Sequence, residues 1–90
     1  MMAVDLDPQE LHATLMRLKR ARGQLDGVIR MLEEGRDCEA VVMQIAAVSK
    51  AVNRAGFSVI ATGLRACYAA DPTGEAVDAK RLEKMFLSLS

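Results

Sequence analysis

Apolar residues recur at helical spacing along the first third of the chain. Spacings of three, four and seven are typical of an amphipathic helix with a coiled-coil-like seam. The positions of this seam are Leu11, Leu15, Leu18, Leu25, Ile29 and Leu32. Asp7 and Pro8 suit a helix start, and Gly35 suits a helix end. We therefore predict a first helix over about residues 8–34.

A second and a third helical stretch follow. The second repeats apolar residues with a helical period, and no proline interrupts it before Pro72. Its apolar positions are Val41, Val42, Ile45, Val48, Val52, Val59, Ile60, Leu64 and Cys67. We predict one long helix over about residues 38–70, a turn at 71–74 and a short helix at about 75–88. The apolar face of the third helix consists of Val77, Leu82, Met85, Phe86 and Leu89.

The composition of the chain, taken together with these helices, predicts the fold. The chain has 90 residues, of which 51% are apolar and only 3% aromatic. Two long helices and a short one make a poor closed monomer at this length, whereas two helical hairpins packed antiparallel make a four-helix bundle. We predict an all-α fold in which residues 1–90 form a single helical domain. Its antiparallel hairpins pair into a four-helix-bundle dimer, and the third helix adds an interface.

The charged residues and the chain start limit the functional classes. Twelve basic residues balance twelve acidic ones, so any nucleic-acid site must be a local patch. The acidic N-terminus lacks a signal peptide, and no apolar run is long enough to cross a membrane, so we expect a cytoplasmic protein without a membrane partner. No Ser/His/Asp set, carboxylate pair or phosphate-binding loop is present, which argues against an enzyme.

Two cysteines carry the candidate chemistry. Cys38 and Cys67 are 29 positions apart, which is about 43 Å on one straight helix. A bridge needs Cα atoms within about 7 Å, so the two thiols can meet only between antiparallel helices of two subunits. Such a pair suits thiol redox sensing or a soft metal such as Cu(I). A third possibility, that both cysteines are inert, remains open at this point.

Cations cluster on both long helices. Arg17, Lys19, Arg20 and Arg22 fall within six residues, and Lys50 and Arg54 lie one turn apart on the second helix. In a helical hairpin these groups lie at similar heights and form one basic zone, which dimer symmetry repeats. A solvated charged face is the alternative, and no known DNA-binding motif is present.

These segments together resemble one protein family. RLKRARGQLDG at 17–27, MLEE at 31–34, QIAAV at 44–48 and the two cysteines resemble the copper-sensitive operon repressors, CsoR and its relatives RcnR and FrmR. The resemblance implies a dimer of dimers that binds operator double-stranded DNA and releases it when the sensor site is occupied. It implies sensor thiols at Cys38 and Cys67. The DNA-binding residues that we expect are Arg17, Lys19, Arg20, Lys50 and Arg54.

Two positions depart from the copper sensors of that family. Gly63 stands where those sensors carry a histidine, and Asp37 stands where they favour a tyrosine. A two-cysteine site without the histidine most resembles the persulfide-sensing branch, the CsoR-like sulfurtransferase repressors (CstR). We therefore expect reactive sulfur species to be the signal, with Cys38 as the attacking thiolate and Cys67 of the neighbouring subunit as the resolving thiol, and no bound cofactor or metal. The alternatives are a Cu(I) sensor using the same two thiolates, a thiol-redox enzyme or carrier, and a plain interaction module.

Overall fold

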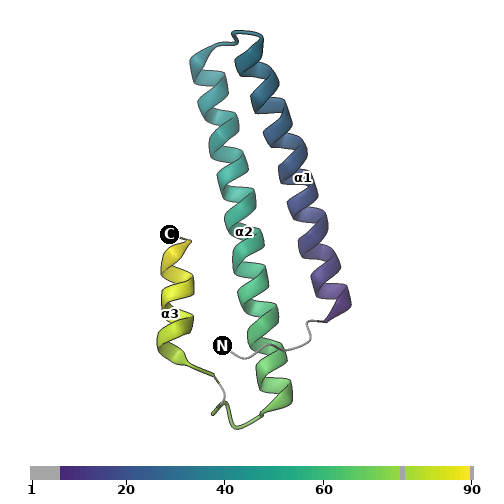
Figure 1. Ribbon diagram of the computed structural model, residues 1–90, viewed down its shortest axis with the longest axis vertical. Coiled ribbons are helices and arrows are strands. Elements are labelled where there is room, and N and C mark those ends of the chain that lie inside the picture. Colours follow the sequence, from purple (N-terminus) through teal and green to yellow (C-terminus); the bar gives the residue numbers. More distant parts are fainter. Residues whose placement is uncertain (1–6, 76, 90) are drawn as a thin grey trace.

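The computed structural model describes residues 7–75 and 77–89, which form three α-helices and contain no strand. The helices are α1 (Pro8–Glu33), α2 (Cys38–Ala70) and α3 (Ala79–Ser88). Figure 1 shows α1 and α2 as a long antiparallel hairpin, with α3 lying along the lower half of α2 on the side away from α1. The all-α prediction is confirmed.

The chain forms a single layer of helices. Its principal extents are 55 × 26 × 14 Å. A helix with its side chains is about 10–12 Å across, so the shortest extent is little more than one helix thick. Among residues 7–75 and 77–89, no second layer of helices therefore covers either broad face of the hairpin.

The hairpin turn follows from Gly35 and Asp37. Gly35 has a positive φ of 69°. The following Arg36 N–H donates to the Met31 carbonyl at 2.9 Å, which is the long hydrogen bond of a Schellman end. Asp37 then caps α2, because its carboxylate accepts from the Ala40 N–H at 3.2 Å. Glycine and aspartate thus end one helix and begin the next within a few residues.

The third helix starts later than predicted, at Ala79 instead of about residue 75. The Asp78 carboxylate accepts from the N–H groups of Lys80 and Arg81 at 3.1 and 3.2 Å, and so defines the start of the helix. Before it, the Asp71 carboxylate accepts from the Thr73 N–H at 3.2 Å and holds a turn. The side chain–backbone bonds of these two aspartates compete with an earlier helix start.

Small residues form the contact between α1 and α2. The buried positions of α1 recur every seven residues, at Thr14, Ala21 and Val28. Val41, Ala55 and Thr62 follow the same period on α2. The Thr14 and Ser58 hydroxyls share a hydrogen bond of 2.8 Å across this contact.

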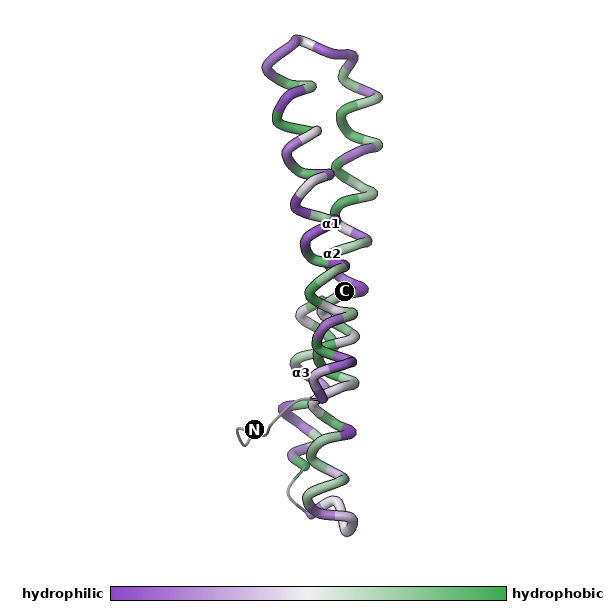
Figure 2. The backbone as a smooth tube through the Cα atoms, turned by 90° about the vertical axis from the view of Figure 1, so that its right-hand side faces the viewer, coloured by the Kyte–Doolittle hydropathy of each residue, from purple (hydrophilic) through white to green (hydrophobic). Residues whose placement is uncertain are grey.

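The predicted leucine seam of α1 lies outside that contact. Leu15, Leu25 and Leu32 are 45%, 47% and 62% exposed. Figure 2 shows hydrophobic residues recurring along the full height of the hairpin, including the upper part that α3 does not cover. The seam is thus an uncovered apolar face in a single chain.

α3 packs on α2 through its C-terminal half. Phe86 stacks on Phe57 with ring centroids 5.6 Å apart. A Cβ on Gly56 would lie 2.9 Å from both Leu89 methyl carbons, so glycine allows the close approach of the two segments. None of the residues in α3 is fully buried.

Candidate functional site

The two thiols lie at opposite ends of one unbroken helix. Cys38 is the first residue of α2 and is exposed, and Cys67 lies three residues before its end and is buried. Both are free thiols. A 33-residue helix with no break holds their Cα atoms about 43 Å apart, far beyond the reach of a disulfide or a shared metal ion. Within one chain the pair therefore does not form a site.

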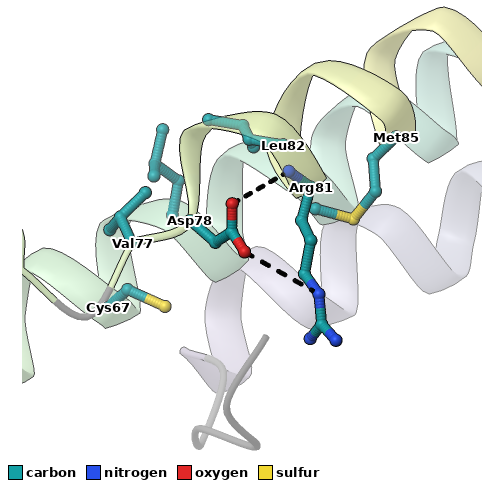
Figure 3. A pocket seen from close by; sticks show the side chains of 7 residues that line it. Cys67, Val77, Asp78, Arg81, Leu82 and Met85 are labelled. Atoms are coloured by element: carbon teal, nitrogen blue, oxygen red, sulfur yellow. Dashed lines mark hydrogen bonds and ion pairs between the residues drawn. The ribbon is translucent and has the colours of Figure 1, made fainter.

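Cys67 lies beneath α3. Its side chain faces a cavity of about 10 Å³ lined by Leu64 of α2 and by residues of α3 and the segment before it. The latter residues are Val77, Asp78, Arg81, Leu82 and Met85. Figure 3 shows Cys67 under the start of this segment, with Asp78 bonded to Arg81 beside it. Cys67 is only 2% exposed as a result.

The described residues around Cys67 include no group of three histidine, cysteine or carboxylate side chains that would hold a metal ion. Gly63, one helical turn before Cys67, is buried and has no side chain to donate.

Three of the five expected DNA-binding residues come together. Arg17 and Arg20 of α1 and Arg54 of α2, together with Ala51, line an open cleft of about 290 Å³. The hairpin brings these cations to one height, as the sequence predicted. Lys19 and Lys50 are exposed and do not line the cleft. A cleft lined by three guanidinium groups is suited to bind phosphate groups.

A polar cluster at the other end of the hairpin was not predicted. Arg65 of α2 pairs with Glu10 of α1 at 2.5 Å. Beside this pair, the buried Thr62 hydroxyl has no hydrogen-bond partner within the described part of the chain. All three residues line an open cleft of about 570 Å³. The sequence pattern gave no signal for this pair, because residues 55 positions apart are joined only by the hairpin register.

Within residues 7–75 and 77–89, no helix combines the length and the apolar character needed to cross a bilayer.

Comparison with known proteins gives one family and several relatives. Residues 10–88 match the family model described as metal-sensitive transcriptional repressor. The copper-sensing transcriptional repressor CsoR of Mycobacterium ulcerans is 45% identical over 58 residues, covering 64% of this chain and 50% of that protein. CsoR of Mycobacterium tuberculosis (strain H37Rv) is 43% identical over 56 residues, covering 62% and 47%. The chain thus aligns with about half the length of these curated relatives. No solved structure matches the chain.

Proposed function

The chain belongs to the family of metal-sensitive transcriptional repressors, and from that premise we propose that it binds operator DNA as a homo-oligomer and releases it when a ligand occupies an intersubunit Cys38–Cys67 pair. The family consists of transcriptional regulators, in agreement with the expectation that the chain is not an enzyme. The proposed DNA-binding residues lie on α1 and α2, and both proposed sensor thiols lie on α2, so we assign both tasks to one domain acting in the cytoplasm.

The uncovered faces of the hairpin support the oligomer. The chain is one helix thick, and the leucine seam of α1 is about half exposed. Full burial of an exposed leucine contributes about 1.5–3 kcal/mol, so covering the exposed half of each seam leucine contributes about 1 kcal/mol and favours pairing of two such faces. A second copy of this chain is the partner that we propose for these apolar faces. An antiparallel twofold pairing of α2 also brings Cys38 of one chain beside Cys67 of the other, twice per dimer.

The arginine cleft supports the DNA interface. The chain carries no net charge, so phosphate binding must rely on a local cluster such as Arg17, Arg20 and Arg54. Lys19 and Lys50 extend the same basic zone outside the cleft. In a dimer the zone occurs twice and follows the phosphate backbone over a longer stretch.

Copper(I) is the signal that the comparisons favour. The relatives described above are named copper-sensing transcriptional repressors. Cysteine thiolates are soft ligands that select Cu(I). Gly63 supplies no donor, the sensor pair supplies two sulfurs, and both thiols must lose a proton to bind. The bound ion would supply a link between subunits at the end of each helix pair.

A titration tests this proposal directly. The full chain is titrated with Cu(I) against a strong chelator while the anisotropy of a labelled duplex from upstream of its own gene is followed. We expect Cu(I) to be retained and DNA to be released in parallel. Cys67→Ser should still bind DNA and fail to respond to Cu(I). Cu(I) retention without any change in DNA affinity contradicts the proposal.

Reactive sulfur is the second candidate, and the buried Gly63 is the observation that favours it. Disulfide chemistry needs only the two thiols. The Cys38 thiolate attacks the terminal sulfur of a persulfide R–S–SH and forms Cys38–S–SH, and a thiolate RS⁻ leaves. The Cys67 thiolate of the neighbouring subunit then attacks the inner sulfur and forms the Cys38–Cys67 disulfide, and HS⁻ leaves.

Intact mass spectrometry with a DNA-binding assay separates the two signals. If a persulfide donor links two chains and abolishes DNA binding while Cu(I) does neither, reactive sulfur is the signal. If Cu(I) alone releases DNA, the copper proposal holds.

A further inference from the structure

The two sensor thiols differ sharply in access. Cys38 is exposed at the start of α2, whereas Cys67 is 2% exposed beneath α3. The cavity beside Cys67 measures about 10 Å³, which is close to the space that one water molecule needs. A reagent larger than a single small group therefore reaches Cys67 only if α3 moves.

α3 covers Cys67 without being firmly buried itself. Leu82 and Met85 line the cavity and are half-buried, and none of the residues in α3 is fully buried. The far end of the helix contacts α2 through the stacking of Phe86 on Phe57 and through Leu89, which approaches Gly56. Elements with few buried contacts open at low free-energy cost, so the cover over Cys67 is a movable one.

The rim of the cavity is polar. Asp78 caps α3, and its carboxylate lies 3.9 Å from the Arg81 guanidinium, which also lines the cavity. Both side chains are more than half exposed, so they form a solvated rim around the cavity. The apolar residues Leu64, Val77 and Leu82 define the interior.

We propose that α3 is a lid whose residues Leu82 and Met85 determine which reagents reach Cys67. When α3 is packed over Cys67, the lid admits single ions or inorganic sulfur species to this thiol. It excludes disulfides of the size of glutathione disulfide. Cys38, at the start of α2, lies outside this lid. The inference deepens the proposed function, on which it rests, by assigning the sensor a small inorganic ligand and by making the buried thiol the selective member of the pair.

The test compares a small and a bulky probe at each thiol separately. Cys67→Ser leaves only Cys38, and Cys38→Ser leaves only Cys67. Methyl methanethiolsulfonate transfers a methylthio group to the thiolate as methanesulfinate leaves. Ellman's reagent transfers a thionitrobenzoate group as a second thionitrobenzoate leaves. We expect the ratio of small-probe to bulky-probe rate constants to be at least about tenfold larger at Cys67 than at Cys38.

A variant of the lid and a matched control test whether α3 causes the larger rate ratio at Cys67. In the Cys38→Ser chain, Leu82→Ala should bring the rate ratio of Cys67 down toward that of Cys38. Leu87→Ala changes the same residue type on α3 at a position that is 62% exposed, and should leave the ratio unchanged. If Leu82→Ala does not fold, as judged by circular dichroism, Met85→Ala takes its place. Equal ratios at the two thiols, or equal effects of the lid variant and Leu87→Ala, overturn the proposal. The measurement uses neither DNA nor copper, so its failure is distinct from a failure of the repressor function.

Discussion

Replacing Arg54 by alanine should weaken DNA binding and flatten its dependence on salt. Arg54 lines the cleft between the two long helices together with Arg17 and Arg20. Its removal takes one cation from each copy of the cleft and leaves the buried residues of the hairpin untouched. Folding should therefore persist while the contact to phosphate is lost.

The size of the effect follows from the number of arginines in the cleft. Each phosphate neutralised on B-DNA contributes about −0.9 to the slope of log K against log salt concentration. Three arginines in each of two subunits contribute about −5.4, and Arg54→Ala removes about 1.8 of this. Between about 50 and about 200 mM salt, the affinity should fall roughly 10³-fold for the unchanged chain and roughly 10²-fold for the variant.

The assay is fluorescence anisotropy of a labelled duplex at several salt concentrations. Arg36→Ala is the matched control, because Arg36 is an exposed arginine at the hairpin turn, away from the cleft. It should leave the slope near that of the unchanged chain. Equal slopes for Arg54→Ala and the unchanged chain would refute the assignment of the cleft to DNA.

Three substitutions test the packing that positions the two sites. Thr14→Val leaves the Ser58 hydroxyl without its hydrogen-bond partner at 2.8 Å and should lower the free energy of unfolding by about 1–3 kcal/mol. Urea denaturation measures this change, and an unchanged free energy of unfolding would mean that the hydrogen bond is not formed. Gly35→Ala forces a side chain into a φ of 69° and should cost about 1–2 kcal/mol by the same assay, an unchanged midpoint being the contrary result. Gly56→Ala should leave the free energy of unfolding nearly unchanged, because the Leu89 methyls at 2.9 Å are the end of a flexible side chain and alanine gains about 1 kcal/mol of helix propensity. A loss of stability above about 2 kcal/mol would show that this contact is rigid.

Local sequence signals predicted most of the fold. The apolar period, Asp37 and Gly35 placed α1 and α2 within a residue of their observed ends. The start of α3 was predicted too early, because the aspartates at 71 and 78 bond to nearby backbone N–H groups and delay the helix. Such competition depends on individual side-chain geometry, which an apolar period does not contain.

The candidate site was predicted less completely. Helical spacing placed Arg17, Arg20 and Arg54 at one height, and the structure brings them to one cleft. The burial of Cys67 beneath α3 was not predicted, because it depends on where the chain returns after the turn and not on any local pattern. The leucine seam was recognised, but sequence period alone did not show that the smaller residues, such as Ala21, form the contact between α1 and α2.

The identity of the signal was the feature that the sequence predicted least well. The absence of a donor at Gly63 favoured reactive sulfur from sequence, whereas the relatives support copper. Two thiols are compatible with both chemistries, since a soft ion and a sulfur–sulfur bond use the same atoms.

Cross-linking of mixed variants tests the intersubunit sensor pair most directly. Cys38→Ser and Cys67→Ser chains are mixed, refolded together at low concentration and oxidised with diamide, which accepts the two electrons and two protons of the thiols. Intact mass and peptide mapping without reductant then identify the bridge. We expect the mixture to give a heterodimer with one Cys38–Cys67 bridge, and the unchanged chain to give a dimer with two. An unchanged chain that keeps the mass of one chain with an internal bridge, or a mixture without the heterodimer, would contradict the pairing of the two thiols between subunits.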